Sequence, residues 1–535
     1  MKRRKFIEGA GYLAVAPLLT SARSSAKPQT TFADAPGEKE IGGSAKGSLD
    51  PISIHPENPK YFLFRGKPLV LVAATEHYGS VVNRRFNFAR YLKQAANDKQ
   101  TVTRTFLLFR ELQSARNPCS PAKPDSPDYV APWPRTGPGK AMDGEPIYDL
   151  DHWNPEYFDR LHQFLALASD LGIAVELTLF SNTYADNIWA LNPLRAKNNR
   201  QGIGNMEWPD YTSLKDQRLV ERQAAYARKI IQETSRYDNI YYEICNEPGG
   251  NVGHHVTFKQ VDEWQQMMGS VVREELRRLG RRQLLFGQSA FSYTPHFSQD
   301  FDSAFRGSLF DAVNVHPLPG LSYNGRTYNL GRFMSKDLKL AAFSDFFLAT
   351  YSANKPCVSD EDNAASLYRD TQGWTIQRKR AWMAIMTGSH YDYIDFSIQV
   401  DAETGTPQSR QKIRSWMRTL SEFVQSLDVI HSKPLPNWIE NMPAHLVGTT
   451  LAVPGREYVA YLADAREVSD PTAGQPISGR VTFQLPEGSF EICLFSPTSG
   501  GYSPCLAIQG QNHIHVDLPP FRDDIVIRAT RAGKA

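Results

Sequence analysis

The stretch Tyr241-Tyr242-Glu243-Ile244-Cys245-Asn246-Glu247-Pro248 decides the fold that we expect for this chain. Its first five residues suit a buried β-strand, and the proline ends the strand because it has no N–H to donate. Glu247 therefore lies where the strand reaches the surface. In barrels of parallel strands, catalytic side chains lie at the carboxyl ends of the strands, so Glu247 is the first candidate for a catalytic residue.

A companion stretch follows later in the chain: Lys355-Pro356-Cys357-Val358-Ser359-Asp360-Glu361-Asp362-Asn363. It has the same design, because a short apolar run suited to a strand ends in carboxylates. A glutamate before a proline is more often a solvated turn residue, and this second strand is what favours a functional role for Glu247. Because Asp360, Glu361 and Asp362 are consecutive, the sequence leaves open by one residue which of them reacts.

Eight apolar runs of this kind occur along the chain, most of them separated by helical patterns. They are residues 69–74, 102–109, 173–180, 240–245, 283–288, 312–315, 356–359 and 391–396. Continuous apolar strands that alternate with helices indicate a parallel sheet covered on both faces. Eight of them favour an α/β fold of the (β/α)8 type, a TIM barrel, over an open sheet. In this order Glu247 ends strand four and Glu361 ends strand seven.

The helix after residue 154 illustrates the pattern between strands. Asn154 is expected to cap it, Pro155 to occupy its first turn and Gly172 to end it. Residues 261–279 and 374–386 have the periodicity of two further helices. We interpret all three as structural.

Residues 1–26 have the features of an export signal. Lys2-Arg3-Arg4-Lys5 precedes a mild apolar run over residues 10–19, which is too short to span a bilayer, and small residues follow up to Ala26. The paired arginines and the weakly hydrophobic, glycine-containing run resemble a twin-arginine signal. We therefore expect a bacterial protein that is exported already folded to the periplasm or the cell exterior. The alternative is a basic N-terminal arm.

From about residue 436 the pattern changes to short segments of period-two alternation between Gly and Pro turns, as in 458–462, 481–485 and 523–527. This spacing predicts a small all-β sandwich after the barrel. The expected organisation is a twin-arginine-type signal peptide (1–26), a linker (27–50), the catalytic barrel (51–432) and the C-terminal β-sandwich (433–535).

The composition is that of a large globular protein, with 535 residues of which 41% are hydrophobic and 22% charged. Removal of residues 1–26 leaves 55 basic and 56 acidic residues, a formal charge of about −1. We therefore expect no nucleic-acid partner, and no membrane contact once the signal is removed. The oligomeric state stays open.

The five cysteines form neither a disulfide framework nor a zinc pattern. Cys119, Cys245 and Cys357 are far apart in sequence. Cys493 and Cys505 lie in one late β-rich segment and are the pair that could form a disulfide in an oxidising compartment.

Two connections after barrel strands are too long to be plain loops: residues 111–150 and 181–211. Long loops after barrel strands lie on the catalytic face and usually serve recognition. Their aromatic side chains suit stacking on sugar rings, although some of them would instead pack the loops down. They are Trp133, Tyr184, Trp189, Trp208 and Tyr211, of which we single out Trp189 as a substrate-binding candidate.

A barrel with carboxylates at the ends of two strands suggests hydrolysis of glycosidic bonds. One acid must protonate the leaving oxygen while the other attacks the sugar or activates water, and rigid strands hold the two at a fixed separation. Glu247 and Glu361 are the expected pair. This chemistry needs no cofactor, and no metal is expected because a ligand spacing such as His-Glu-x-x-His does not occur.

At these residues the chain resembles the retaining glycoside hydrolases of the large (β/α)8 clan that includes cellulases, mannanases and β-galactosidases. There the acid/base glutamate follows an asparagine on the fourth strand, and the nucleophilic glutamate ends the seventh. Further matches over most of residues 60–430 point to a largely uncharacterised bacterial branch whose barrel is followed by a collagen-binding-like β-sandwich and which includes enzymes acting on plant cell-wall pectins. These matches are Phe62-Leu63-Phe64-Arg65-Gly66-Lys67-Pro68, Thr103-Arg104-Thr105-Phe106, Trp153-Asn154-Pro155-Glu156-Tyr157-Phe158 and Tyr393-Ile394-Asp395-Phe396-Ser397.

The resemblance implies a role for four residues at the ends of strands two, four and seven. Glu247 would be the general acid/base and Glu361 the nucleophile. Asn246 would hydrogen-bond the 2-hydroxyl of the reacting sugar. Arg104 would hold Glu361 ionised, because a neighbouring cation lowers the pKa of a carboxylate.

The resemblance also implies three wall residues. His316, at the end of strand six, corresponds to the site histidine or tyrosine of the clan, and His77 would line the site from strand one. Strand eight lacks the tryptophan on which many members of the clan stack the sugar, so Tyr393 or Phe396 would take its place. Some relatives with this layout use an Asp and a Glu as the catalytic pair. If that holds here, the assignment of Glu247 would change.

The expected protein is therefore an exported, retaining glycoside hydrolase of a plant or microbial polysaccharide or oligosaccharide. One alternative is an inverting hydrolase of the same fold, which the distance between the carboxylates distinguishes. Another is a non-catalytic carbohydrate-binding or adhesion protein whose sandwich does the binding. Glu243 and Glu176, inside strands four and three, are interpreted as ion-pair partners of the barrel interior. The sugar, the linkage and endo or exo action stay open.

Overall fold

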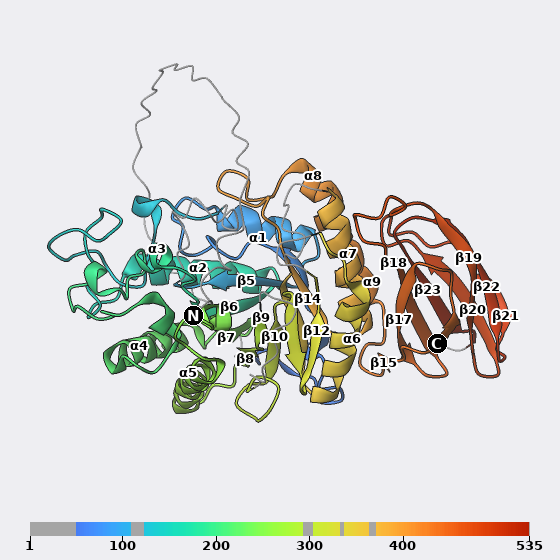
Figure 1. The fold of residues 1–535 in the computed structure, drawn as a ribbon, viewed down its shortest axis with the longest axis horizontal. Helices are drawn as coiled ribbons and strands as arrows, with labels where there is room; N and C mark the ends of the chain where they lie inside the picture. Colours follow the sequence, from blue (N-terminus) through green and yellow to red (C-terminus); the bar gives the residue numbers. More distant parts are fainter. Residues whose placement is uncertain (1–49, 109–121, 293–302, 332–335, 363–370, 534–535) are drawn as a thin grey trace, which may run out of the picture. The chain divides into compact units, whose positions relative to one another are not determined.

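The eight predicted barrel strands all form, and they make one parallel sheet that closes almost completely into a barrel (Figure 1). In the computed structural model these strands are β4 (Val72–Thr75), β5 (Val102–Phe106), β6 (Ala174–Ser181), β7 (Ile240–Asn246), β8 (Leu285–Gln288), β10 (Ala312–Val315), β13 (Cys357–Asp362) and β14 (His390–Ile394). Backbone hydrogen bonds from Thr101 to Val72 (3.1 Å) and from Phe106 to His77 (2.9 Å) join the first strand to the second. The predicted TIM barrel is confirmed.

The structure describes residues 50–108, 122–292, 303–331, 336–362 and 371–533. The predicted signal peptide, nearly all of the predicted linker, Cys119 and the start of the loop over residues 111–150 lie outside this range. The expectations about them stay predictions.

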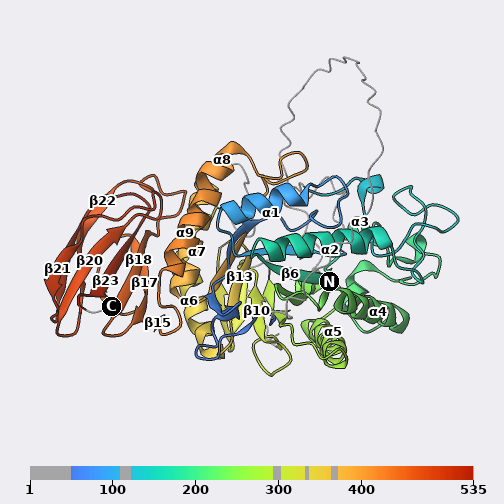
Figure 2. The ribbon, with the colours of Figure 1, turned by 180° about the vertical axis from the view of Figure 1, so that it is seen from behind.

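Most of the helices cover the outside of the barrel, whereas α3 belongs to the long loop that follows β6 (Figures 1 and 2). The helices are α1 (Phe88–Asn97), α2 (Pro155–Asp170), α3 (Asp186–Trp189), α4 (Gln217–Thr234), α5 (Phe258–Arg278), α6 (Leu340–Thr350), α7 (Thr371–Met386), α8 (Pro407–Ser409) and α9 (Ser415–Gln425). The start of α2 is as predicted, because the Asn154 side chain accepts a hydrogen bond from the N–H of Glu156 at 3.2 Å. Gly172 follows the helix with a φ of +73°, a conformation that suits glycine.

A small antiparallel sheet closes the amino-terminal end of the barrel. It consists of β1 (Ser53–Ile54), β2 (Phe62–Phe64) and β3 (Lys67–Leu69). The ring of Phe62 stacks on those of Phe286, at 5.7 Å, and Tyr241, at 6.5 Å between centroids. Both partners lie at the beginnings of barrel strands, so the opposite, carboxyl end is the one left for a site.

A second small sheet lies beyond the carboxyl ends of the fifth and sixth barrel strands. It is formed by β9 (Phe291–Ser292), β11 (Gly320–Tyr323) and β12 (Arg326–Asn329). β11 and β12 form an antiparallel hairpin, with Asn324 and Gly325 at its turn.

The C-terminal strands form the predicted sandwich. One sheet has the order β15-β17-β18-β23-β20-β21 and the other the order β16-β19-β22. Their bounds are β15 (Lys433–Pro434), β16 (Ile439–Asn441), β17 (Leu446–Val453), β18 (Glu457–Asp464), β19 (Ile477–Phe483), β20 (Ser489–Phe495), β21 (Leu506–Gln509), β22 (Ile514–Phe521) and β23 (Asp524–Arg531). Trp438 stacks on Tyr458 of one sheet and on Phe483 of the other, which fills the space between them.

A disulfide joins Cys493 of β20 to Cys505, so this predicted pair is confirmed. Cys245 and Cys357 are buried.

The sandwich packs directly on the barrel, because residues 48–535 form one compact unit. Helices α7 and α9 lie between the barrel strands and the sandwich (Figures 1 and 2). Trp382 of α7 stacks on Tyr461 of β18 with 5.6 Å between the ring centroids. Arg378 of α7, which is fully buried, donates two hydrogen bonds of 2.8 and 2.9 Å to Asp524 of β23.

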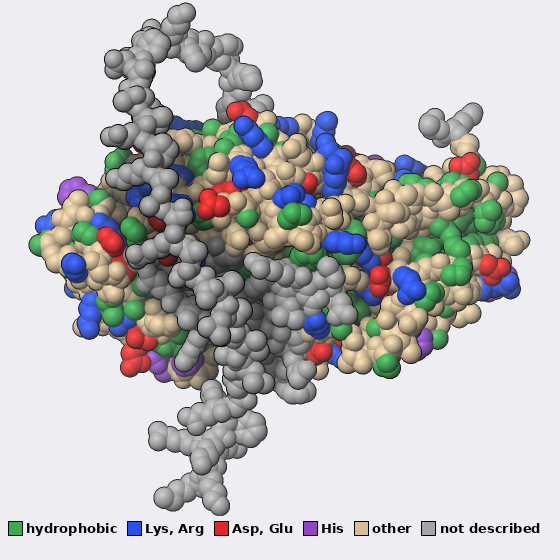
Figure 3. Space-filling model, turned by 90° about the horizontal axis from the view of Figure 1, so that it is seen from above, with side chains coloured by type: hydrophobic (Ala, Val, Ile, Leu, Met, Phe, Trp, Pro, Cys, Tyr) green, Lys and Arg blue, Asp and Glu red, His purple; other side chains and the backbone are tan. Residues whose placement is uncertain are grey.

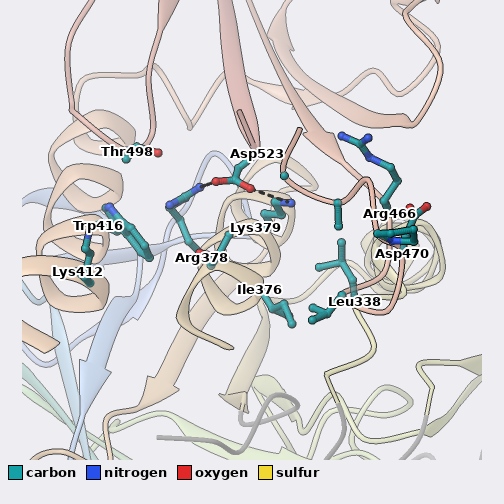
Figure 4. Close-up of a pocket in the computed structure, with 15 residues that line it drawn as sticks. Leu338, Ile376, Arg378, Lys379, Lys412, Trp416, Arg466, Asp470, Thr498 and Asp523 are labelled. Carbon is teal, nitrogen blue, oxygen red and sulfur yellow. Dashed lines mark ion pairs between the residues drawn. The ribbon is translucent and has the colours of Figure 1, made fainter. Parts of the chain in front are cut away.

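A cavity of about 650 Å³ remains in this interface (Figure 4). Arg378 and Lys379 flank Asp523 there, with closest nitrogen–oxygen distances of 3.6 and 3.7 Å. Lys379 also donates to the backbone carbonyl of Asp464 at 3.0 Å. These cationic groups have partners from the sandwich, so we assign the cavity to the packing of the two parts.

Acidic and basic side chains are interspersed on the described part of the face in Figure 3, as expected for a balanced charge. Within the described ranges, none of the helices combines the length and the apolar character needed to cross a membrane.

Candidate active site

Glu247 and Glu361 both lie at carboxyl ends of barrel strands, as predicted. Glu247 directly follows β7, and Glu361 is the penultimate residue of β13. Both have a left-handed backbone, with φ of +47° and +52°. Residues other than glycine rarely adopt this conformation, and it is concentrated at functional sites.

The three consecutive acids of β13 do not all face the same side of the strand. The register of β13 against β14 shifts between Ser359 and Asp362. Asp360 and Glu361 both face the barrel interior as a result, whereas Asp362 faces outward and lies 3.0 Å from the Nε of Arg380. Asp362 is therefore removed from the set of candidate reactive groups.

The guanidinium of Arg104, on β5, is the common partner of the acids in the barrel interior. Its side chain is only 1% exposed. It donates to the carboxylate of Glu361, and its other contacts are Glu243 at 2.6 Å, Asn246 Oδ1 at 3.0 Å, Glu176 at 3.2 Å and Asp360 at 3.2 Å. The predicted contact of Arg104 with Glu361 is present in the structure.

The cations of the site keep two acids ionised. Burial raises the pKa of Asp360, but Arg104 and His316 outweigh this effect and lower the pKa to about 2. Burial also raises the pKa of Glu361, and His316 and His77 outweigh it, so that the pKa lies below its usual value. Glu361 is therefore a carboxylate at neutral pH, the form that a nucleophile needs.

Glu247 receives hydrogen bonds on both carboxylate oxygens. Its Oε1 lies 3.0 Å from Nδ1 of His316, and its Oε2 accepts a hydrogen bond of 2.7 Å from the hydroxyl of Tyr184. Its backbone N–H donates to the side chain of Gln288. A carboxylate oxygen of Glu247, a ring nitrogen of His316 and a carboxylate oxygen of Glu361 all lie within 4.8 Å of one another.

His77, just after β4, links Glu361 to an acid of the eighth strand. Its Nε2 lies 2.7 Å from Asp392, and its Nδ1 lies 3.8 Å from Glu361. Burial lowers the pKa of His77, but Asp392 and Glu361 outweigh this effect and raise it to about 9. The imidazole is therefore charged at neutral pH and adds a cation beside the nucleophile candidate.

A layer of polar groups lies beneath this site. Thr178 donates to Glu243 at 2.8 Å, and the amide of Asn314 donates to Glu176 at 2.5 Å and to Glu243 at 2.9 Å. Burial raises the pKa of Glu176 well above its usual value, and the neighbouring Asp360 raises it further. The interpretation of Glu243 and Glu176 as partners of an interior base is confirmed, since both contact Arg104.

The structure also brings Asn246 to the site. Its Oδ1 accepts from Arg104, and its Nδ2 donates to Ser181 at 3.2 Å and to the hydroxyl of Tyr184 at 2.9 Å. Tyr78 donates a hydrogen bond of 3.2 Å to Glu361, and Phe396 lies in one apolar cluster with Tyr78.

Two predicted substrate-binding residues do not reach this group. Trp189 has no exposed surface: its ring packs on Tyr211 at 5.3 Å, and its indole N–H donates to the carbonyl of Met206 at 3.2 Å. Tyr393 faces the helix layer and lies beside Trp374 of α7, because strand alternation turns Asp392 inward instead. Both side chains pack the fold.

Asp392 and Asn314 of this site were not predicted from the sequence, and Tyr184 was predicted only as one of five loop aromatics that suit stacking on a sugar. Strand alternation could have found the first two, because Asn314 is two residues before His316 and Asp392 alternates with Tyr391 and Tyr393. Tyr184 lies in a long loop with a φ of +55°, and no periodic pattern identifies such a residue.

Two sets of side chains, Glu243 with His316 and Asp360, and Glu247 with His316 and Glu361, have possible metal-ligand atoms within 4.8 Å of one another. The guanidinium of Arg104 already contacts Glu243, Asp360 and Glu361. A fixed positive charge at this point disfavours a second cation, so the donor set fits an arginine-centred site better than a metal site.

Comparisons with known proteins bear on the fold. A model of a domain of unknown function, DUF6298, matches residues 122–247, which is less than half of the chain but includes both Asn246 and Glu247. No curated protein matches the chain.

Solved structures match over most of the chain. A candidate glycoside hydrolase from Bacteroides vulgatus is 12% identical with a TM-score of 0.58, covering 91% of this chain and 84% of its own. A glycoside hydrolase of family 5 from the same organism is 11% identical with a TM-score of 0.55, covering 90% and 93%. At these identities the likeness establishes the fold, a TIM barrel of the kind found in glycoside hydrolases.

Proposed function

We propose that this protein is a retaining glycoside hydrolase that acts on a plant or microbial polysaccharide or oligosaccharide. The observation that carries the proposal is the proximity of Glu247 and Glu361, whose nearest carboxylate oxygens lie within 4.8 Å. Retaining enzymes hold their two carboxyl groups about 5–5.5 Å apart, whereas inverting enzymes need about 6.5–9.5 Å to admit a water molecule. The separation favours retention over inversion.

The proposed reaction is a double displacement. Glu361, held ionised by Arg104, His77 and His316, attacks the anomeric carbon, while Glu247 gives a proton to the leaving oxygen. Water then attacks the glycosyl-enzyme and gives its proton to Glu247, and Glu361 leaves as a carboxylate. Asn246 would contact the 2-hydroxyl of the sugar. No step needs a cofactor.

The names of the structural neighbours support the same class of reaction. Those above a TM-score of 0.5 include two glycoside hydrolases from Bacteroides vulgatus and a further glycoside hydrolase with a TM-score of 0.53. The carboxylate pair on strands four and seven supplies the chemical group that such an activity requires.

The first experiment is hydrolysis of a panel of aryl glycosides and plant polysaccharides by the mature protein, beside Glu247→Gln and Glu361→Gln. We expect activity on at least one glycan and a loss of about 10³-fold or more in both variants. Proton NMR of the first product formed should show the anomer of the substrate. The opposite anomer would establish the inverting alternative.

Asp362→Asn is the matched control, because this acid is one residue from Glu361 but faces outward to Arg380. The folded Asp362→Asn variant should keep its activity. A glycosyl-enzyme trapped with a 2-fluoro sugar and mapped by mass spectrometry should carry the label on Glu361, and a label on Asp360 would move the role by one residue. Glycan binding without hydrolysis would favour the binding-protein alternative.

We further propose export through the twin-arginine route to the periplasm or the cell exterior, on the strength of residues 1–26. The disulfide between Cys493 and Cys505 supports an oxidising destination. Replacement of Arg3 and Arg4 by lysine should leave the precursor in the cytoplasm of a bacterial host, as fractionation would show. Unchanged export of this variant would contradict the twin-arginine assignment.

A further inference from the structure

His316 lies between the two halves of the site and meets a carboxylate at each ring nitrogen. It follows β10 and is only 2% exposed. Its Nδ1 lies 3.0 Å from Oε1 of Glu247, and its Nε2 lies 3.3 Å from Oδ2 of Asp360. Glu361 is farther from the same nitrogen, at 3.9 Å. His316 therefore lies between Asp360 at its Nε2 and Glu247 at its Nδ1.

Asp360 is placed to orient this ring. It lies one residue before Glu361 on β13 and is only 1% exposed. Its Oδ2 contacts both His316 and the Nε of Arg104, at 3.3 and 3.2 Å, and its Oδ1 has no hydrogen-bond partner among the described residues. An aspartate held this way is an ionised acceptor.

An anion at Nε2 decides where the protons of the ring lie. Nε2 must carry a hydrogen that points at Asp360, so Nδ1 is the nitrogen that gains or loses a proton. Nδ1 faces Glu247. A carboxylate behind a histidine selects the tautomer in the same way in the Ser-His-Asp triad of serine proteases, where loss of that carboxylate's charge lowers kcat strongly.

We propose that Asp360 is a positioning residue that holds His316 so that one proton is shared between Nδ1 of His316 and Oε1 of Glu247. The proposal rests on the proposed function and assigns the source of the proton that the leaving group receives. That source is the His316–Glu247 pair.

The proton balance closes over one turnover. In the first step Glu361 bonds to the anomeric carbon, the glycosidic bond breaks and the proton of the pair moves to the leaving oxygen. His316 is then neutral, with its Nε2–H donated to Asp360, and Glu247 is a carboxylate. In the second step water gives one proton back to the pair, its oxygen bonds to the anomeric carbon, and the bond to Glu361 breaks. One proton leaves the pair and one returns.

Several charged groups besides Asp360 face His316 or its partners. From the neighbouring strands and their ends these are Glu243, Glu247, Glu361, His77 and Arg104. Glu247 is the one that meets Nδ1 within hydrogen-bonding distance. Replacement of Asp360 by Asn therefore removes the negative charge beside Nε2 of His316, whereas Glu247 stays beside Nδ1.

The dependence on the leaving group tests this assignment. Asp360→Asn should lower kcat by about 10²- to 10⁴-fold on glycosides with poor leaving groups, which need a proton. On dinitrophenyl glycosides, whose leaving group needs none, the loss in the glycosylation step should stay below about tenfold. The basic limb of the pH profile of kcat/KM should move down by about one unit, because the pair loses a nearby anion.

Two variants control this experiment. Asp360→Glu keeps the charge and should restore part of the activity with poor leaving groups, whereas Asp362→Asn should leave the pH profile unchanged. Equal losses of Asp360→Asn on both kinds of substrate would overturn the proposal, since they would indicate a nucleophile or a purely structural residue.

NMR of ¹³C-histidine-labelled protein gives a readout that does not depend on hydrolysis. The signal of His316, assigned from its loss in His316→Gln, should titrate well above pH 7 in the wild type and at least one unit lower in Asp360→Asn. An unchanged midpoint would overturn the positioning role even in an active enzyme. A lowered midpoint in a protein without hydrolytic activity would support the positioning of the ring and overturn the proposed function.

Discussion

At the scale of single residues, Arg104 holds together the acids of the barrel interior. Arg104→Leu leaves Glu243, Asp360 and Glu361 without their shared cation. We expect the free energy of unfolding to fall by about 3–5 kcal/mol, the usual cost of removing one partner of a buried ion pair. The acidic limb of kcat/KM should move to higher pH, because Glu361 loses a cation that lowers its pKa.

Urea denaturation and a pH–rate profile measure these two effects. Arg84→Leu is the control, because Arg84 pairs with Glu156 while both side chains are 47% exposed. Exposed pairs contribute at most about 1 kcal/mol. If Arg84→Leu and Arg104→Leu lowered the free energy of unfolding by similar amounts, the buried Arg104 would contribute no more to stability than an exposed arginine.

The pKa of His316 predicts how its contribution to stability changes with pH. Burial lowers this pKa, but Glu361 and Asp360 outweigh burial and raise it from 6.5 to about 10. A group whose pKa is raised on folding stabilises the protein fully below its unfolded pKa, and the contribution disappears as the pH rises through the folded pKa. The stability difference between wild type and His316→Gln should therefore be largest below pH 6.5 and should shrink towards pH 10.

Denaturation in urea at a series of pH values measures this difference. His390 provides the opposite case, since burial lowers its pKa to about 4. The difference between wild type and His390→Gln should be largest above pH 6.5 and shrink as the pH falls towards 4. If the stability differences for His316→Gln and His390→Gln changed with pH in the same direction, the assigned directions of the two pKa shifts would be wrong.

At the scale of elements, the ends of β7 and β13 place their glutamates in left-handed backbone conformations. A residue with a Cβ is disfavoured there by about 1–2 kcal/mol, whereas glycine is not. Glu247→Gly and Glu361→Gly should each be more stable than the corresponding alanine variant by about 1 kcal/mol. Thermal unfolding of the four inactive variants measures the difference.

Ser359, within β13, is the internal comparison because its φ is not positive. There the order should be reversed, with alanine more stable than glycine by about 0.5–1 kcal/mol. Alanine that is at least as stable as glycine at positions 247 and 361 would contradict the argument from backbone conformation.

The elements were more predictable than the directions of their side chains. Buried parallel strands carry a continuous apolar signal, and so the strand order and the placement of Glu247 and Glu361 could be predicted. The register shift in β13 has no such signal, and therefore the sequence could not tell Asp360 from Glu361. Trp189 shows why ligand contacts in long loops could not be predicted. The sequence around an aromatic residue that packs a loop does not differ from the sequence around one that binds a ligand.

At the scale of the described molecule, the contact between barrel and sandwich depends on a buried ion pair. Asp524→Ala leaves Arg378 charged and buried, and we expect it to lower the free energy of unfolding by about 3–5 kcal/mol. Asp517→Ala, in the same sandwich, removes a partner of Arg480 that is 72% exposed and should cost at most about 1 kcal/mol. Calorimetry of the two variants compares them, and equal melting temperatures would contradict the role of Arg378.

The hydrophobic core of the barrel continues into the sandwich through Leu451, Val459, Tyr461, Phe495 and Val526. A module that moves between proteins by recombination must present a face that water tolerates when its neighbour is exchanged. On its face toward the barrel, this sandwich instead has apolar side chains and Asp524, the ion-pair partner of the buried Arg378. A gene cut between the two parts would yield two fragments with exposed apolar surface, and we therefore expect barrel and sandwich to be inherited together as one unit.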